Sequence, residues 1–297
     1  MERALVESVR SFNRAVTERV GALNDHFLGR EHSLGEARLL WEIGVAGAEV
    51  RELRNRLALD SAYISRLLRA LERRGLVMVE TSADDRRVRC ARLTSAGLAE
   101  RAELDRRADA FAESILEPLS TGQQARLAAA MAEVERLLMA STVRIAITDP
   151  SSADAQWCLE QYIQELNERF DAGWDPAQSI SAYPHEMTPP AGLFLVASLR
   201  QQPVGCGALK FHGDAPGDAP AELKRMWVSP QVRSLGLGRR LLTELERHAR
   251  EAGVTVLRLE TNRALVEAIA LYRRSGYQEV AAFNDEPYAH HWFEKRL

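Results

Sequence analysis

Hydrophobic positions recur with a helical period through the first 140 residues of the chain. In residues 61–74, apolar side chains fall at i, i+3, i+4 and i+7, which predicts a helix with one buried stripe. The stripe consists of Ile64, Leu67, Leu68 and Leu71. Asp60 or Ser61 would cap the start of this helix, and Gly75 would end it.

Further periodic segments lie on both sides of this helix. Ser33 with Glu36 three residues later is typical of a capping box and predicts the start of another helix. Two short β-rich runs at 77–80 and 88–94 predict a hairpin with a charged tip. Other helices are predicted at residues 2–28, 51–57, 95–116 and 121–140.

The pattern changes near residue 141, where β-rich runs begin to alternate with helical ones. Strands are predicted at 143–147, 193–199, 203–211, 222–228 and 254–262, and helices at 154–170, from Leu237 onwards, and at 264–277. The expected architecture is an α+β chain of two domains. Residues 1–141 form a mainly helical domain, and residues 142–297 form a mixed α/β domain.

Composition excludes several classes of protein. Of 297 residues, 46% are hydrophobic and 27% are charged, which excludes fibrous or wholly disordered chains. No apolar run is long enough for a membrane span, and charges interrupt the N-terminal segment, unlike a signal peptide. Cys90, Cys158 and Cys206 lack metal-type spacing and fit a reducing compartment. We therefore expect a cytoplasmic protein with neither a metal nor a membrane partner.

The net charge of −3 hides a strong local excess of arginine. Residues 51–92 carry eleven arginines against six acidic side chains. A surface that binds phosphates must therefore be local, and this segment is the place to expect it.

A helix, a short turn, a second helix and an arginine-tipped hairpin are typical of a winged helix-turn-helix. The sequence VRELRNRLALDSAYISRLLRALERRGLV, followed by TSADDRRVRCARLTSAG, resembles the MarR family of transcription regulators over about residues 1–140. The resemblance implies binding to a double-stranded DNA operator and a homodimer formed by the outer helices. It assigns to the major groove Ser61, Tyr63, Ser65, Arg66 and Arg69, and to the wing Arg86 and Arg87.

Two alternatives remain open for this domain. Asp84 and Asp85 can pair with Arg86 or Arg87, so one wing arginine can have a structural role. The domain can also have lost DNA binding and serve only to form the dimer.

The strongest chemical motif is ELKRMWVSPQVRSLGLGRRLLTELERHA at residues 222–249. Glycines at the start of a helix leave backbone N–H groups free to bind an anion at close range. The R-x-x-G-x-G pattern resembles the acyl-CoA loop of GNAT N-acetyltransferases, and the order of elements over about 143–297 agrees. The resemblance implies a mostly antiparallel central sheet and acetyl-CoA as cosubstrate. It assigns to acetyl-CoA Met226, Trp227, Val228, Arg233, Ser234, Leu235, Gly236, Leu237, Gly238, Arg239, Asn262 and Tyr272.

The same resemblance suggests the groups that move protons. Tyr272 matches the general acid that protonates the departing CoA thiolate. Glu222 is the expected base, since residues 222, 224, 226 and 228 would share one face of a strand. The alternatives are a salt bridge from Glu222 to Lys224 or Arg225, proton transfer through a water chain, and a helix-capping role for Asn262.

The acceptor site is expected between the segment 169–190 and a final hairpin at 284–297. The candidate contacts there are Arg169, Trp174, Ser179, Tyr288 and His290. An arginine at this site would favour an acceptor with a carboxylate, such as an amino acid. The expected reaction is acetyl transfer by direct attack of a primary amine of a small molecule. The alternative is a DNA-binding regulator whose second domain only senses CoA or an amine.

Overall fold

The computed structural model describes residues 3–20, 26–81, 85, 87–171, 173–180, 182–213 and 219–297, with Ser234 described by its backbone only. Contacts within the chain divide it into two compact units, Met1–Ala129 and Ala130–Leu297. The long helix α6 (Thr121–Thr142) crosses this division. No helix in the described part of the chain is long and apolar enough to cross a membrane.

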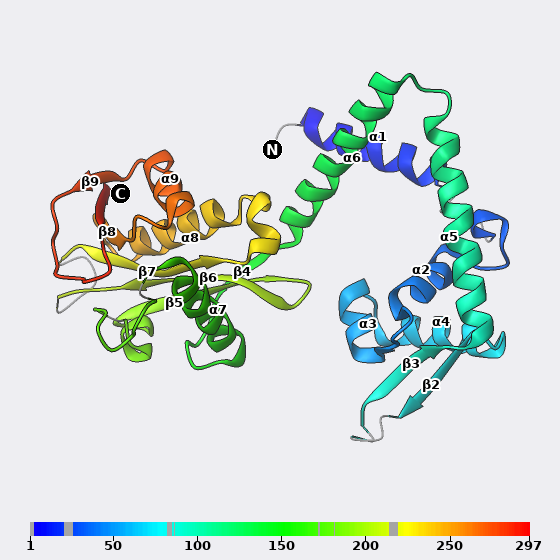
Figure 1. Ribbon diagram of the computed structural model, residues 1–297, viewed down its shortest axis with the longest axis horizontal. Helices are drawn as coiled ribbons and strands as arrows, with labels where there is room; N and C mark the ends of the chain where they lie inside the picture. Colours follow the sequence, from blue (N-terminus) through cyan, green and yellow to red (C-terminus); the bar gives the residue numbers. More distant parts are fainter. Residues whose placement is uncertain are drawn as a thin grey trace. The chain divides into compact units, whose positions relative to one another are not determined.

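The first unit is mainly helical and carries a small antiparallel sheet in the order β1-β3-β2 (Figure 1). Its helical elements are α1 (Arg3–Arg19), η1 (Phe27–Gly29), α2 (Leu34–Ile43), α3 (Val50–Leu57), α4 (Ser61–Arg73) and α5 (Ser95–Leu116). Its strands are β1 (Ala48–Glu49), β2 (Val77–Thr81) and β3 (Arg89–Leu93). Of these three strands, the short strand β1 was not anticipated by the hydrophobic pattern.

Helix α4 has the boundaries and the buried face that its sequence predicts. The side chain of Asp60 accepts a hydrogen bond from the backbone N–H of Tyr63 at 2.8 Å, so Asp60 is the N-cap. The buried residues of α4 are the four apolar residues of the predicted stripe. Ser33 and Glu36 form the expected capping box at the start of α2.

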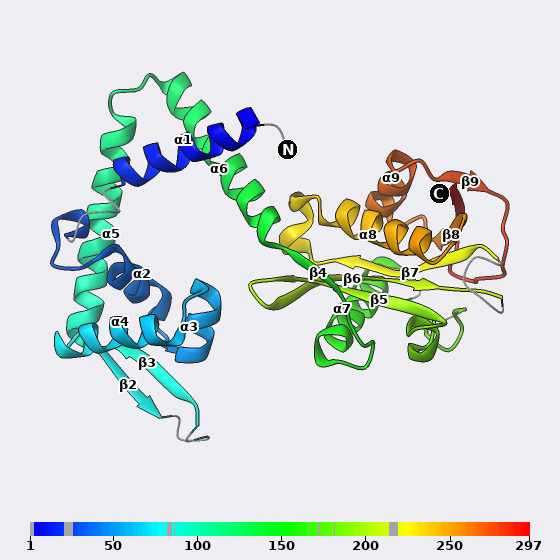
Figure 2. The ribbon, with the colours of Figure 1, turned by 180° about the vertical axis from the view of Figure 1, so that it is seen from behind.

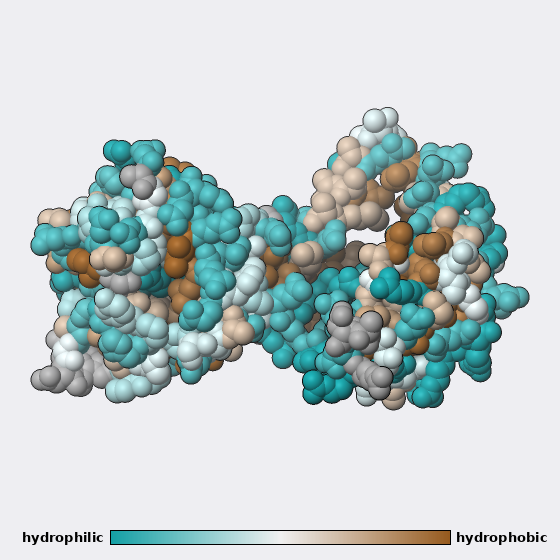
Figure 3. Space-filling view, turned by 60° about the horizontal axis from the view of Figure 1, so that its bottom comes forward, coloured by the Kyte–Doolittle hydropathy of each residue, from teal (hydrophilic) through white to brown (hydrophobic). Residues whose placement is uncertain are grey.

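The predicted single helix over residues 2–28 is wrong. Helix α1 ends at Arg19, and Phe27–Gly29 forms a separate 3₁₀ turn. Leu28 has a φ of 54° and Gly29 a φ of 69°, which cannot continue a right-handed helix. Helix α1 buries no residue within the single chain. Its exposed apolar side chains are Leu5, Val6, Val9, Phe12 and Val16. Apolar patches on the surface of the protein are visible in Figure 3.

The second unit is built on a seven-stranded sheet in the order β4-β5-β6-β7-β8-β10-β9 (Figure 2). Its strands are β4 (Arg144–Ile147), β5 (Gly192–Leu199), β6 (Gln202–Lys210), β7 (Ala221–Val228), β8 (Val256–Thr261), β9 (Gln278–Val280) and β10 (His291–Arg296). Its helical elements after α6 are α7 (Ala153–Arg169), η2 (Pro184–Met187), η3 (Pro230–Leu235), α8 (Leu237–Glu251) and α9 (Val266–Arg274). All neighbouring strands pair antiparallel except β7 and β8.

Helices cover both faces of this sheet. Helix α7 packs on one face through Ala155 and Cys158, while α8 and α9 pack on the other (Figure 1). The final hairpin pairs β10 with β9, so residues 284–290 form the loop between these strands and not a hairpin arm. This corrects the predicted hairpin at 284–297.

The end of α6 is tied to the start of α8. Arg240, in the first turn of α8, donates hydrogen bonds to the carbonyl oxygens of Ala140 and, at 2.9 Å, Val143. These carbonyls belong to the last turn of α6 and to the residue before β4, where helix termini leave acceptors without helical partners. A cationic side chain at a helix C-terminus is also favoured by the helix dipole.

Strand β7 contains a β-bulge. Between the paired residues Lys224 and Trp227, two residues of β7 lie opposite one residue of β6. The bulge includes Arg225, whose φ of 56° lies in the left-handed region that L residues rarely adopt. Bulges of this kind redirect side chains and are frequent beside active sites.

The bulge inverts the alternation of side chains along β7. Trp227 packs in the cluster under α7, whereas Met226 and Val228 pack with Leu223 in the cluster under α8. Since Glu222 adjoins Leu223 before the bulge, it faces the side opposite to Met226 and Val228. The predicted common face for residues 222, 224, 226 and 228 is therefore wrong, because that prediction assumed a regular strand.

Strands β7 and β8 separate soon after they meet. Their parallel pairing covers only Ala221 with Leu257 and Glu222 with Arg258. Beyond these pairs, β7 continues to Val228 and β8 to Thr261. The sheet therefore opens between the two strands.

Replacement of Asp60 with alanine should lower the free energy of unfolding of the first unit by about 1 kcal/mol, because it removes the cap of α4. Urea unfolding of the full chain would measure this loss. Asp60→Asn serves as the control, since asparagine is an equally good N-cap and should retain the stability. Equal losses in both variants would contradict the capping role.

Candidate active site

Two cavities meet where β7 and β8 separate. The larger has a volume of about 500 Å³ and lies between α7, the end of β7, the start of α8 and α9. The smaller has a volume of about 90 Å³ and lies between β7, β8, α7 and the loops around residues 170–182 and 286–289. Tyr162, Met226 and Tyr272 line both cavities.

The glycine loop forms one end of the larger cavity. Gly236 has a φ of 70° and precedes α8, so it turns the chain from η3 into the helix. A Cβ atom at Gly236 would meet no other heavy atom within 4 Å, which leaves space beside the loop. Arg239 also lines this end. An exposed helix start with an adjacent cation suits a phosphate group.

The other predicted cosubstrate contacts are divided between this cavity and the core. Met226, Trp227, Val228, Arg233 and Gly238 line the larger cavity. Leu237 is buried in the core, and Leu235 packs against the same core. Ser234, whose backbone N–H belongs to the predicted diphosphate-binding loop, is described by its backbone only.

Asn262 lines the smaller cavity and not the larger one. Its Nδ2 donates to the carbonyl oxygen of Tyr288 at 2.7 Å, and its Oδ1 accepts from the N–H of Ala264 at 2.9 Å. Asn262 therefore holds the loop at Tyr288 against the turn that leads into α9.

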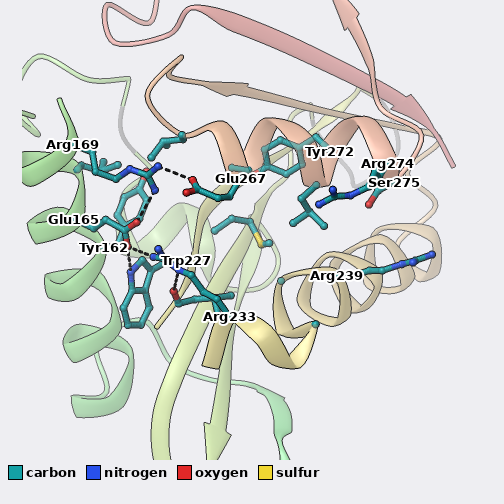
Figure 4. A pocket seen from close by; sticks show the side chains of 18 residues that line it. Tyr162, Glu165, Arg169, Trp227, Arg233, Arg239, Glu267, Tyr272, Arg274 and Ser275 are labelled. Atoms are coloured by element: carbon teal, nitrogen blue, oxygen red, sulfur yellow. Dashed lines mark hydrogen bonds and ion pairs between the residues drawn. The ribbon is translucent and has the colours of Figure 1, made fainter. Parts of the chain in front are cut away.

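Glu165 connects three elements around the larger cavity (Figure 4). Its carboxylate accepts hydrogen bonds from Trp227 Nε1 at 2.9 Å, from Arg169 Nη1 at 3.0 Å and from Arg233. Arg169 also donates to Glu267 of α9 at 2.6 Å, so α7 is joined to both β7 and α9. Although desolvation lowers the pKa of Arg169, the contacts with Glu267 and Glu165 outweigh it and raise the pKa.

Aromatic rings and four charged side chains line the smaller cavity. Trp174, Ser179 and Tyr288, three predicted acceptor contacts, lie together in its wall. Arg169 instead lines the larger cavity, and His290 is not part of either lining. The charged residues of the wall are Lys224, Arg225, Glu260 and Glu286.

Tyr272 lies at the junction of the two cavities and is 6% exposed. Burial raises the pKa of its phenol well above the usual value, and nearby Tyr162 and Glu260 raise it further. Its hydroxyl thus stays protonated throughout the physiological range. A buried phenol between two substrate-sized cavities is suited to donate a proton.

Two carboxylates share one ammonium group near this junction. Lys224 Nζ lies 3.0 Å from Glu222 Oε2 and also contacts Glu260 Oε1. Burial lowers the pKa of Lys224, but the two carboxylates outweigh it and raise the pKa. Glu222 also lies 3.2 Å from His212 Nε2. The salt-bridge alternative for Glu222 is therefore present in the structure.

Only Glu260 of these two carboxylates lines the smaller cavity. Its side chain is 10% exposed, and its buried Oε2 has no hydrogen-bond partner among the described residues. Sequence reasoning missed Glu260, although its place next to the end of the predicted strand 254–262 was a usable signal. It also missed Glu165 and Arg225, whose roles depend on contacts between distant elements.

The predicted DNA-contacting residues of α4 lie away from the buried stripe. Ser61, Arg66 and Arg69 are exposed, and Tyr63 and Ser65 are half-buried. The guanidinium of Arg66 lies 5.5 Å from the ring centre of Tyr63. Tyr63 also packs against the core of its own unit, so Ser61, Arg66 and Arg69 form the exposed part of this face.

The tip of the predicted wing is described only in part. Arg87 pairs with Asp85 through its Nε at 3.3 Å and its backbone N–H at 2.9 Å. The structural alternative for one wing arginine therefore applies to Arg87. The predictions for Arg86 and Asp84 lie outside the described residues.

Comparison with known families agrees with both halves of this architecture. Residues 159–277 match the Acetyltransferase (GNAT) family, and residues 33–88 match the MarR family. A relative named IAA acetyltransferase, from Azospirillum brasilense, is 36% identical over 138 residues, which cover 46% of this chain and 88% of the relative. The chain belongs to the GNAT acetyltransferase family. It is an N-acetyltransferase that also carries a MarR-family segment.

Another relative and a solved structure are similar to parts of the chain. N-alpha-acetyltransferase RimI of Mycobacterium tuberculosis is 33% identical over 143 residues, which cover 48% of this chain and 84% of that protein. The solved structure of wild-type MarR from E. coli shows 20% identity with a TM-score of 0.38 and covers 42% of this chain and 93% of that one. GNAT acetyltransferases use acetyl-CoA. No group of three or more potential metal-ligating side chains is found in the described residues.

Proposed function

We propose that this protein is a MarR-type transcription regulator and an acetyltransferase in one chain, and that it acetylates a primary amine of a small molecule by direct attack. The observation that carries the enzymatic half is the junction of two cavities at Tyr272. One cavity suits a long cosubstrate with a diphosphate, and the other suits a small head group. The two reacting groups would meet at Tyr272, one of the residues that line both cavities.

Acetyl-CoA would occupy the larger cavity. The backbone N–H groups of residues 234–239 would bind its diphosphate, with Arg239 adding positive charge. Met226 and Val228 line the path from this loop towards Tyr272 and would contact the pantetheine arm. Arg233 is held by Glu165 and by the carbonyl of Val228 at 3.1 Å, so its side chain would shape the cavity wall.

The reaction needs an unprotonated amine and a proton for the leaving thiolate. A carboxylate at the smaller cavity would accept one proton from the ammonium group of the acceptor. The amine nitrogen would then form a bond to the thioester carbon while the carbon–sulfur bond breaks. Tyr272 would donate its proton to the thiolate and recover one that the nitrogen loses. The products would be the amide, the CoA thiol and one proton released to solvent.

Glu260 fits the role of the base better than Glu222. Glu260 lines the same cavity as Tyr272, and its buried Oε2 has no hydrogen-bond partner among the described residues. Glu222 lies on the opposite face of β7 from Met226 and does not line either cavity. Glu222 would instead help to hold Lys224 in place.

The first unit would bind operator DNA in the cytoplasm as a homodimer. Arg66 and Arg69 of α4 are exposed and would enter the major groove. Apolar side chains of α1 and α6 lie exposed in the single chain, among them Phe12 and Leu137. A second copy of the chain would cover such residues, because exposed apolar patches of this kind mark interaction sites.

Replacement of Tyr272 with phenylalanine should lower kcat by about 100-fold or more and leave the KM for acetyl-CoA nearly unchanged, because it removes only the acid. In the unaltered enzyme, the raised pKa of Tyr272 keeps its hydroxyl protonated at alkaline pH. Deprotonation of Tyr272 should therefore cause no fall in kcat below about pH 10. Steady-state rates across pH would measure both effects. Tyr277→Phe, in the neighbouring buried ring, is the control, and equal kcat values in both variants would refute the acid role.

Replacement of Glu260 with glutamine should lower kcat by about 100-fold, with the largest loss at low pH, where the acceptor amine is protonated. Glu222→Gln is the matched control, because it removes the other carboxylate that pairs with Lys224. Its loss should be smaller and independent of pH. A pH–rate profile that changes with Glu222→Gln and not with Glu260→Gln would return the base role to Glu222.

Replacement of both Arg66 and Arg69 with alanine should weaken operator binding by about tenfold or more. The slope of log binding constant against log salt concentration should also become less steep, by about 0.9 for each phosphate that the variant no longer neutralises. Gel shifts at several salt concentrations, with DNA selected by binding to the unaltered protein, would measure this. Arg106→Ala, which removes an exposed arginine of α5, is the control. Unchanged affinity in the double variant would mean that α4 does not contact DNA.

A further inference from the structure

Arg225 has an unusual position in the wall of the smaller cavity. It lies in the bulge of β7, with its backbone in the left-handed region at a φ of 56°. A non-glycine residue held there is under backbone strain and persists only where surrounding contacts fix it. The bulge places the side chain of Arg225 at the cavity that also contains Glu260 and Tyr272.

Two aromatic rings hold the guanidinium of Arg225. Its central carbon lies 5.1 Å from the ring centre of Trp174 and 5.6 Å from that of Tyr162. The two rings are themselves in contact, with centres 6.3 Å apart. Arginine stacked on ring faces keeps its charge, and its flat fork is fixed in one plane. Arg225 is thus oriented from α7 and from the loop after α7.

Two other charged side chains in the wall of this cavity are held by protein groups. Lys224 faces the carboxylates of Glu222 and Glu260. The carboxylate of Glu286 accepts hydrogen bonds from Ser179 Oγ at 2.9 Å and from the N–H of Ile180 at 2.6 Å. The guanidinium of Arg225 has five N–H donors, so it can bind a carboxylate in addition to its protein contacts.

We propose that Arg225 binds a carboxylate of the acceptor, and that the acceptor is a small amino acid whose amine and carboxylate lie close together. The ammonium group would bind at Glu260 Oε2, and the carboxylate would bind at Arg225. The smaller cavity, with a volume of about 90 Å³, suits a head group of this size. This inference rests on the proposed function, since it takes an amine as the group that is acetylated. It places the carboxylate-binding arginine at position 225, whereas the sequence suggested Arg169.

The test compares L-amino acids with their α-carboxamides, which keep the amine and lose the negative charge. With the unaltered enzyme, kcat/KM for the best amino acid should exceed that of its carboxamide by about 10- to 100-fold, the range of a charge-assisted hydrogen-bonded pair. Arg225→Gln should remove this preference by raising the KM of the amino acid, with kcat and the carboxamide rates changing less than about threefold. Arg225→Lys should restore part of the preference, because it keeps the charge without the fork.

Arg169→Gln is the matched control, since Arg169 lines the larger cavity and should not change the preference for a carboxylate. Equal losses for amino acid and carboxamide in Arg225→Gln would assign Arg225 a purely structural role and overturn the inference. The absence of any preference in the unaltered enzyme would overturn it as well.

Calorimetric binding of the same amino acids separates this inference from the proposed function. If no amine is acetylated while binding still depends on Arg225, the proposed reaction fails and the carboxylate site stands. If amines are acetylated without regard to a carboxylate, the reaction stands and the carboxylate site fails.

Discussion

The separation of β7 from β8 is the constraint on which the rest of the second unit depends. Two strands that part inside a sheet give up hydrogen bonds between their backbones, and groups left in this way must find other partners. Strand β8 stays in the sheet because β10 pairs with it along its whole length, from Val256 to Thr261. Strand β7 stays because β6 pairs with it on the other side. Both cavities lie where these two strands have separated.

Charge pairing keeps the opened region in shape. Glu165 accepts hydrogen bonds from Trp227, Arg169 and Arg233. Arg169 also donates a hydrogen bond to Glu267 of α9. A partly buried group of this kind is stable only when each charge has a partner, since an unpaired ion in such a place costs several kcal/mol. The fold therefore joins α7, β7 and α9 through one connected set of side chains. A change at Glu165 would disturb all three elements together.

Features that depend on residues close together in the chain could be predicted from the sequence. They include the stripe of α4, the capping box at Ser33, the glycine loop before α8 and most element boundaries. The failures have a different origin. The face shared by Glu222 and Met226 was assigned on a regular period of two, and a single extra residue at Arg225 changed it. No local signal marks that residue, because the bulge is fixed by partners on β6 and α7.

The acceptor cavity shows the same limit. Trp174, Ser179 and Tyr288, three of the candidate acceptor contacts, lie together in the wall of the smaller cavity, where two loops meet at one end of the sheet. Arg169 was placed with them because it is near in sequence, but it lies one helical turn from Glu165 and pairs with it. Which arginine reaches the cavity depended on three-dimensional pairing of charges. Sequence spacing alone does not contain that information.

The indole rings give each cavity its own chromophore. Trp174 lies beneath the guanidinium of Arg225 at the smaller cavity, and Trp227 lines the larger one with its N–H bonded to Glu165. Indole emission depends on the polarity and charge next to the ring, and these two rings sit beside different groups. Filling one cavity would shift the fluorescence of one ring more than that of the other. Tryptophan fluorescence of the protein would therefore show which of the two cavities is occupied.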